Sequence, residues 1–249
     1  MVGRTREWRS SEAYRESIPY TRAQEFGVAV VDGDRGQTYD MSSLKTALKM
    51  VPAARINKPI ADSYSYFENY ARVVAELPFA EIEQVADELH RAYEQGRKVF
   101  LFGNGGSAAL ASHFACDLSK GTTAPGKFDR HFRVLSLTDN APLITAWAND
   151  TSYEQVFAEQ LRNFVESEDI AFGISGSGSS PNVLLALEVA RESGAINIGL
   201  TGFQGGKMPG LCDLCMVIPS DNMQIVEDLQ LSIAHALFTV IRHRIINAA

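Results

Sequence analysis

The chain has 249 residues, of which 45% are hydrophobic and 21% charged, so it can bury a sizeable core and is not a disordered segment. Its formal net charge of -7 argues against a general nucleic-acid binder. No apolar run approaches the roughly 18 residues of a membrane span, and the N-terminus lacks a signal-peptide core, which predicts a cytoplasmic protein that does not enter a membrane.

Residues 1–60 are predicted to form an N-terminal extension, because scattered arginines and serines there show no sustained apolar period. An Asp-Gly turn between two weakly alternating runs predicts a hairpin over 25–39, and residues 41–50 predict a short helix. Such an extension packs on the main domain or a partner subunit, or serves as a lid or specificity arm. The sequence is compatible with either role.

Residues 61–249 show the pattern of one α/β domain. Apolar residues at helical spacing predict two helices within 61–96, after which strands and helices alternate. The predicted strands are 98–102, 131–137, 170–174, 195–200 and 214–218, and the later helices are 108–120, 140–148, 153–165, 181–193 and 222–246. This alternation predicts a doubly wound, five-stranded parallel sheet flanked by helices, with ligands bound at the carboxyl ends of the strands.

The first glycine-rich loop, 103–107, joins a predicted strand to a helix. Its three glycines allow a tight turn, and Ser107 is predicted to cap the helix, whose positive end would face an anion. His113 and Asp117 follow at a spacing of four residues. They therefore lie on one face of this helix, where they could transfer protons or bind a metal ion.

A second loop, Ser175-Gly-Ser-Gly-Ser-Ser180, stands between a predicted strand and a helix that begins at Pro181. A bare Gly/Ser run is usually a linker, but here the flanking elements leave no room for one. Its hydroxyl and N–H groups predict a phosphate cradle, with Ser180 as the helix cap. Neither loop matches the Walker or the dinucleotide pattern, which favours a sugar phosphate over a nucleotide.

Three cysteines, an odd number, do not suggest a disulfide framework. Cys212-x-x-Cys215 could be a redox or metal pair, but it falls in a strand-like run and has no second pair. This context favours buried structural cysteines.

The C-terminal helix carries Glu227 and His235, and Asp221 or Asn222 can cap its start. A lone histidine in an apolar helix is more often a core residue than a catalyst. Two helices that each offer an imidazole and a carboxylate favour a functional site instead. We therefore predict that His113, Asp117, Glu227 and His235 converge on one divalent metal ion, with zinc preferred, or carry out acid–base chemistry.

The chain closely resembles the SIS (sugar isomerase) domain family and, within it, the phosphoheptose isomerases. The shared segments lie from about residue 62 to the C-terminus: Gly103-Asn-Gly-Gly-Ser with His113-Phe-Ala, Ser136-Leu-Thr-Asp-Asn140, Asn149-Asp150 with Tyr153-Glu-x-x-Phe157, 175–183, Gly199-Leu-Thr-Gly202 with Gly205-Gly-Lys207, and the helix with Glu227 and His235. The resemblance leaves residues 1–60 unexplained.

The resemblance implies conversion of the ketose sedoheptulose 7-phosphate to the aldose D-glycero-D-manno-heptose 7-phosphate through a cis-enediol, a step of heptose biosynthesis. By position, Asp117 and His235 would carry the proton transfers, and His113 and Glu227 would complete a zinc site, one per subunit. The family also implies a homotetramer that shares active sites between subunits. The substrate-binding residues would be Asn104, Gly105, Ser107, Asp139, Asn140, Ser175, Ser177, Ser179, Ser180 and Glu227.

Three positions depart from the family pattern: Asp117 stands for a usual Glu, Glu227 for a frequent Gln and Gly176 for a frequent Thr. The alternatives are a non-catalytic SIS module, which binds a sugar phosphate or a regulatory protein, and an isomerase of a different sugar phosphate. Non-catalytic members tend to lose the carboxylate and the terminal histidine. Because this chain keeps both, the isomerase is the preferred interpretation.

Overall fold

The computed structural model of the protein describes residues 60–123 and 130–247. The predicted hairpin at 25–39 and the predicted helix at 41–50 lie outside the described residues. The division of the chain into an extension over 1–60 and a domain over 61–249 therefore stays a prediction.

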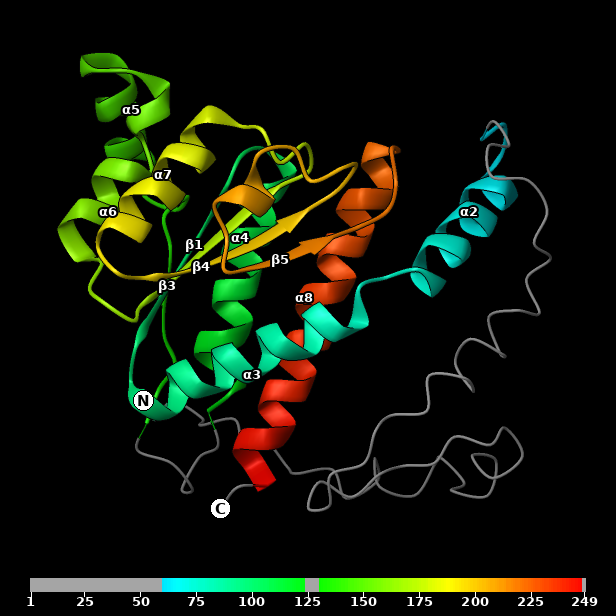
Figure 1. Ribbon diagram of the computed structural model, residues 1–249, viewed down its shortest axis with the longest axis horizontal. Helices are drawn as coiled ribbons and strands as arrows, with labels where there is room; N and C mark the ends of the chain where they lie inside the picture. The colour runs from blue at the N-terminus through cyan, green and yellow to red at the C-terminus, as the bar shows by residue number, and fades with distance from the viewer. Residues whose placement is uncertain (1–59, 124–129, 248–249) are drawn as a thin grey trace, which may run out of the picture. The chain divides into compact units, whose positions relative to one another are not determined.

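The described helices and strands follow the predicted alternation (Figure 1). In chain order they are α2 (Ser63–Ala75), α3 (Phe79–Gln95), β1 (Lys98–Gly103), α4 (Gly106–Cys116), the π-helical turn η3 (Asp117–Gly121), β2 (Arg133–Ser136), α5 (Ala141–Asp150), the 3-10 turn η4 (Tyr153–Gln155), α6 (Ala158–Phe164), β3 (Ile170–Ser175), α7 (Pro181–Glu192), β4 (Ile196–Thr201), the 3-10 turn η5 (Met208–Gly210), β5 (Leu214–Val217) and α8 (Met223–Asn247).

Two predicted helices are each divided in the structure. The helix expected over 153–165 is a 3-10 turn followed by α6, separated at Val156 and Phe157, whose side chains are buried. The helix expected over 108–120 begins two residues earlier, at Gly106, and changes to a π-helical turn at Asp117. Hydrophobic periodicity marks where a helix lies, but it does not distinguish α-helical from 3-10 or π-helical turns.

The five strands form one parallel sheet in the order β2-β1-β3-β4-β5, which confirms the predicted doubly wound fold. Successive residues of a strand point to opposite faces of the sheet. In β1, Val99 and Leu101 therefore enter the core beneath α3, α4 and α8, whereas Phe100 and Phe102 enter the core beneath α5, α6 and α7 (Figure 1).

Several predicted site residues lie at one edge of this sheet, because parallel strands all end on the same side. Gly103, Ser136, Ser175 and Thr201 are the last residues of four strands, and the two glycine-rich loops follow the first and third of these. The sheet therefore brings the two loops to the same edge.

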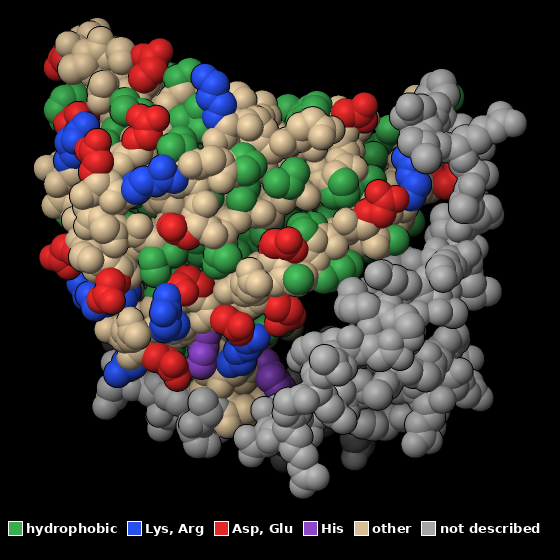
Figure 2. All heavy atoms as spheres, viewed as in Figure 1, with side chains coloured by type: hydrophobic (Ala, Val, Ile, Leu, Met, Phe, Trp, Pro, Cys, Tyr) green, Lys and Arg blue, Asp and Glu red, His purple; other side chains and the backbone are tan. Residues whose placement is uncertain are grey.

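Within the described residues, no helix is long and apolar enough to cross a membrane. On the face that Figure 2 shows, basic and acidic side chains are interspersed, with no broad basic area among the described residues.

A buried carboxylate at the start of the sheet generates the first testable prediction. Asp169 accepts hydrogen bonds from the backbone N–H groups of Lys98, at 2.8 Å, and Glu166, at 2.9 Å, and its Oδ2 lies 3.2 Å from the Lys98 ammonium. Asp169→Ala removes the buried carboxylate that pairs these donors and should lower the free energy of unfolding by about 3 kcal/mol, measured by urea denaturation.

The matched control is Glu166→Ala, which removes the solvent-exposed partner of the same lysine, 2.7 Å away. Because exposed ion pairs contribute little, this variant should leave the urea midpoint nearly unchanged. Equal losses in the two variants would contradict the role given to Asp169.

Candidate active site

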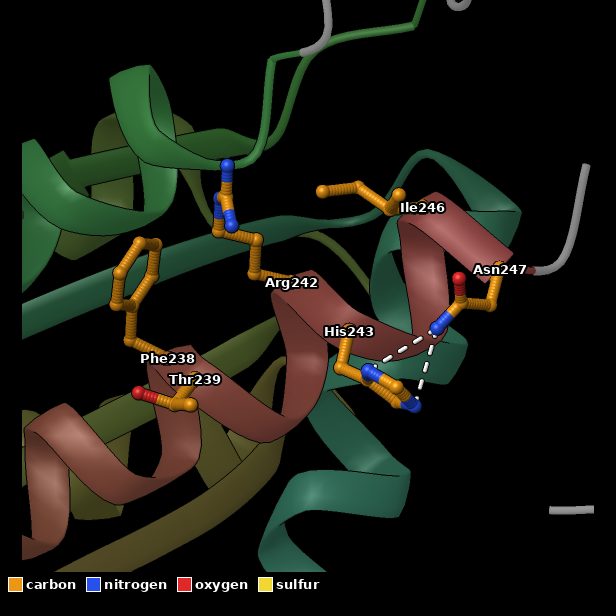
Figure 3. Close-up of a pocket in the computed structure, with 6 residues that line it drawn as sticks. All are labelled: Phe238, Thr239, Arg242, His243, Ile246 and Asn247. Carbon is orange, nitrogen blue, oxygen red and sulfur yellow. Dashed lines mark hydrogen bonds between the residues drawn. The ribbon is translucent and has the colours of Figure 1, made fainter. Parts of the chain in front are cut away.

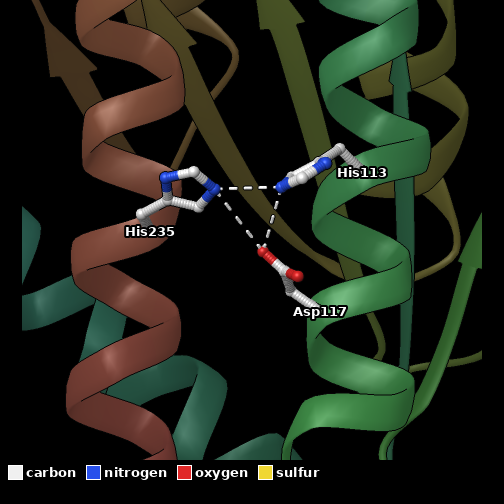
Figure 4. A group of neighbouring side chains, drawn as sticks. All are labelled: His113, Asp117 and His235. Atoms are coloured by element: carbon white, nitrogen blue, oxygen red, sulfur yellow. Dashed lines mark hydrogen bonds and ion pairs between the residues drawn. The ribbon is translucent and has the colours of Figure 1, made fainter.

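Two histidines and an aspartate from two helices form a cluster. His113 and Asp117 come from α4 and the start of η3, and His235 comes from the middle of α8 (Figure 4). The two histidine Nε2 atoms are 2.9 Å apart, and Oδ2 of Asp117 lies 3.4 Å from the Nε2 of His113 and 3.8 Å from that of His235. The structure therefore brings together three of the four residues predicted to converge.

The α-to-π transition occurs at the aspartate of this cluster. Asp117 ends α4 and opens the π-helical turn, and the next side chain, Leu118, is fully buried in the core. At the end of the turn, Gly121 approaches α8 so closely that a Cβ there would stand 2.5 Å from the Phe238 ring. Single π-helical turns often occur at functional sites, where they alter the direction of a side chain.

The cluster has the donor set and spacing of a divalent-metal site. One ligand atom from each of the three residues lies within 4.8 Å of the others. In a tetrahedral zinc site with bonds near 2 Å, neighbouring ligand atoms are about 3.3 Å apart, close to the contacts seen here. About half of each imidazole side chain is exposed, so further ligand positions are accessible from solvent. The residues fit a metal ion with small side-chain adjustments.

Glu227 does not join this cluster, although it was predicted as the fourth ligand. Its carboxylate lies against Gly106 in the first turn of α4, where a Cβ would stand 2.9 Å from Oε1. Gly106 precedes His113 by seven residues, which is about 10 Å along a helix axis. The carboxylate thus lies at the positive end of α4, where the helix dipole favours it, rather than beside the histidines.

The first glycine loop has a different helix start from the one predicted. The N-cap is Gly105, which takes a φ of 54°, and Ser107 lies inside the first turn, where it is buried. Ser107 is therefore not the cap, because the left-handed glycine lets the helix begin earlier. Its backbone N–H donates to the carbonyl of Asn104 and closes the turn.

A network of amides and a phenol, absent from the sequence-based prediction, links the two glycine-rich loops. The Asn104 and Asn182 side chains exchange two hydrogen bonds of 2.8 Å, and the Tyr153 hydroxyl donates to Asn104 Oδ1 at 3.0 Å. Asn182 is buried at the start of α7, just after the serine loop. In the sequence, the only local indication of a role for Asn182 is its position directly after Pro181, the first residue of the helix.

The loop after β2 contains two predicted substrate-binding residues, Asp139 and Asn140: the first is exposed at the surface and the second caps a helix. Asp139 is exposed, and its Oδ1 accepts a hydrogen bond from Ser112 of α4, a residue that sequence reasoning did not select. Asn140 accepts from the Leu143 N–H at 3.1 Å and so caps α5. Its side-chain oxygen is thereby already engaged.

The serine loop presents its hydroxyls unequally. Ser177 and Ser179 are exposed, whereas Ser175 is buried and its hydroxyl lies 3.1 Å from that of Ser180. Ser180 occupies the predicted N-cap position of α7, but its side chain makes no capping bond. The hydroxyls that this loop presents to solvent are therefore those of Ser177 and Ser179.

A separate pocket lies at the C-terminal end of α8, lined by Phe238, Thr239, Arg242, His243, Ile246 and Asn247 (Figure 3). All four of its polar residues have partners: Thr239 donates to the His235 carbonyl at 2.7 Å, Arg242 donates to the Gly121 carbonyl at 3.0 Å, and the Asn247 amide contacts the His243 ring. None of the predicted site residues lines it.

Comparison with known proteins gave a match to the SIS domain over residues 64–202. The phosphoheptose isomerase of Aneurinibacillus thermoaerophilus is 39% identical over 165 residues, which are 66% of this chain and 81% of the relative. That of Paramagnetospirillum magneticum is 43% identical over 143 residues, 57% of this chain and 72% of the relative. A solved phosphoheptose isomerase from Francisella tularensis has a TM-score of 0.67 and 31% identity, covering 72% of this chain and 96% of that chain.

The cluster geometry predicts which side chains govern metal binding. Calorimetric titration with zinc should show affinity weakened at least about 100-fold in His113→Ala and in His235→Ala, because each variant removes one imidazole ligand. Glu227→Gln should stay within about threefold of the parent, since its carboxylate lies elsewhere. A loss in Glu227→Gln as large as in the histidine variants would restore the four-ligand prediction.

Proposed function

Because the chain belongs to the SIS domain family and, within it, to the phosphoheptose isomerases, we propose that it is an aldose–ketose isomerase that converts sedoheptulose 7-phosphate to D-glycero-D-manno-heptose 7-phosphate. The observation that carries the proposal is the cluster of His113, Asp117 and His235, which combines proton acceptors with metal ligands. It lies on helices that flank the sheet of a sugar-phosphate isomerase fold.

The reaction requires two proton transfers at neighbouring carbons. A base removes the proton from C1 while the C2 oxygen gains one, which gives the cis-enediol. The proton is then returned at C2 while the C1 oxygen loses its own, which gives the aldose. One base close to both carbons can serve both transfers, since the carbons are directly bonded.

Asp117 is the residue that can combine two roles in this cluster. Both of its contacts with the histidines use Oδ2, so Oδ1 stays available to accept a proton (Figure 4). His235 faces the cluster through Nε2, and this atom can move a proton only when it does not hold a metal ion. We therefore assign the proton transfer at carbon to Asp117 Oδ1 in the metal-loaded protein and to His235 otherwise.

Zinc is the divalent ion we propose for the site, because two imidazoles and one carboxylate are ligands that it prefers. His113, Asp117 and His235 would hold it. When bound, such a cation polarises the sugar carbonyl and stabilises negative charge on its oxygen.

The defining experiment follows sedoheptulose 7-phosphate by NMR in deuterated water with the protein and zinc. The expected result is formation of the aldose with deuterium at C2, since the transferred proton exchanges with solvent. Binding of the sugar phosphate without turnover would favour the non-catalytic SIS module. Turnover only of a different sugar phosphate would preserve the isomerase and reject the heptose substrate.

Asp117→Asn separates the two roles of the aspartate. Its amide oxygen can still ligate a metal ion but cannot accept a proton at neutral pH, so kcat should fall at least about 100-fold while zinc binding persists. The matched control is His243→Ala, on the same helix as His235 but outside the cluster, which should keep full activity. An active Asp117→Asn protein would remove Asp117 from proton transfer.

We further propose that the serine loop binds the substrate phosphate. Ser177 and Ser179 offer exposed hydroxyls at the N-terminus of α7, where the helix dipole favours an anion. Ser177→Ala should raise KM about tenfold with kcat unchanged, because the phosphate is remote from the reacting carbons. Ser193→Ala, at the other end of α7, is the control. A lower kcat at constant KM would contradict this role.

A homotetramer with shared active sites is the assembly we propose, in the cytoplasm as the sequence predicts. Tyr64 and Phe67 of α2 are 78% and 66% exposed, and Leu231, four residues before His235 on α8, is 39% exposed. A neighbouring subunit that covered these apolar side chains would also shield the half-exposed histidines.

Light scattering should give four chains per particle at micromolar concentration. The double variant Tyr64→Ser with Phe67→Ser should lower that number, because its apolar surface is lost. Phe164→Ser, which alters an exposed side chain of α6, should not. A monomeric parent protein would refute the assembly.

A further inference from the structure

Two of the cysteines are neighbours, and the proposed activity uses neither. Cys212 precedes β5 and Cys215 lies within it, at the edge of the sheet (Figure 1), whereas Cys116 is alone and exposed on α4. The sequence favoured buried structural cysteines at 212 and 215. In the structure both residues are only partly buried and pack against the core beneath α5, α6 and α7.

The two sulfur atoms meet over a glycine of the adjacent strand. A Cβ at Gly199 in β4 would stand 2.8 Å from the Sγ of Cys212 and 3.0 Å from the Sγ of Cys215. Gly199 is the ladder partner of Cys215. Both sulfurs therefore occupy the space that the absent side chain leaves, so they face one another across it.

The interaction between the two thiols shifts their pKa values in opposite directions. Hydrogen bonding with Cys212 lowers the pKa of Cys215. The same bond, followed by burial, raises the pKa of Cys212. Since the thiolate is the reactive form of cysteine, we assign Cys215 as the attacking thiol and Cys212 as the resolving one.

We propose that Cys212 and Cys215 form a redox-active dithiol that hydrogen peroxide converts to an intramolecular disulfide. The Cys215 thiolate attacks one peroxide oxygen, the O–O bond breaks, and Cys215 sulfenic acid and hydroxide result. The Cys212 sulfur then attacks the sulfenic sulfur: an S–S bond forms, the S–O bond breaks, and the hydroxyl leaves as water with the Cys212 proton. The dithiol loses two electrons and the peroxide gains them.

The dithiol lies next to the segment that supports the serine loop. The Cys212 N–H donates to the Met208 carbonyl at 3.1 Å, and the N–H groups of Lys207 and Met208 donate to the Gly178 carbonyl at 2.8 and 3.1 Å. A disulfide would restrain the chain between η5 and β5. The oxidised and reduced proteins thus differ in the rigidity of the segment that follows Lys207 and Met208, the residues whose N–H groups bind the Gly178 carbonyl.

Peptide mass spectrometry of the full-length protein tests the proposal directly. Trypsin cleaves after Lys207 and Arg242 and at no site between, so one peptide carries both cysteines, while Cys116 falls in the peptide 99–120. The reduced, folded protein is treated with a small excess of hydrogen peroxide, denatured with iodoacetamide and digested. The expected peptide 208–242 carries no alkyl group and is two hydrogen atoms lighter than the dithiol form.

Cys116 is an exposed cysteine without a neighbouring thiol, so it serves as the internal control. At the same dose of hydrogen peroxide it should be recovered mainly in the alkylated form. Recovery of peptide 208–242 with both cysteines alkylated, or with oxygen added to each sulfur and no cross-link, would overturn the proposal. So would a disulfide that joins two chains. None of these outcomes depends on isomerase activity, so the proposed function stands or falls separately.

The order of attack is tested by trapping the intermediate with a dimedone probe. Cys212→Ser should accumulate a dimedone adduct at Cys215, because the resolving thiol is absent. Cys215→Ser should give little adduct at Cys212 at the same peroxide dose. The reverse pattern would overturn the assignment of the nucleophile. If a variant does not fold, the wild-type peptide measurement still decides whether the disulfide forms.

Discussion

The close approach of α8 to the π-helical turn after α4 is the contact on which the candidate site depends. Gly121 has no side chain, so the Phe238 ring occupies the space where a Cβ would stand, 2.5 Å away, and Arg242 Nε donates to the Gly121 carbonyl at 3.0 Å. Leu118 anchors the same turn in the core. With the two helices held together in this way, His235 meets His113 and Asp117, although 122 residues separate the histidines in the chain.

The parallel sheet positions the two glycine-rich loops of the candidate site. All five strands end at one edge, and β1 and β3 are adjacent in the sheet. The loops that follow these two strands are therefore neighbours in space, although they are far apart in the sequence. The side-chain amides of Asn104 and Asn182 then link one loop to the other through two hydrogen bonds of 2.8 Å, in which each amide is once the donor and once the acceptor. A pair of this kind constrains direction as well as distance, because each amide must present both its oxygen and its nitrogen.

Local patterns made most of the fold and part of the site predictable. Strand and helix periods are properties of short segments, and the spacing of His113 and Asp117 on one helix face needs no tertiary information. Glu227 was misplaced because the spacing along α8 does not reveal which end of α4 it meets. Ser107 was misassigned as a cap because the φ of Gly105 sets the helix start. Asn182, Ser112 and the thiols over Gly199 act through contacts across the fold, which spacing alone cannot give.

The separation of the cluster residues along the chain links ion binding to the folding equilibrium. An unfolded chain has no preformed set of His113, Asp117 and His235, so a cation that prefers this set binds the native state and shifts the population toward it. At a free concentration 100 times the dissociation constant, such linkage contributes about 2.7 kcal/mol. The supply of the ion in the surroundings would then change the fraction of chains in which the α4–α8 contact is formed, independently of any turnover.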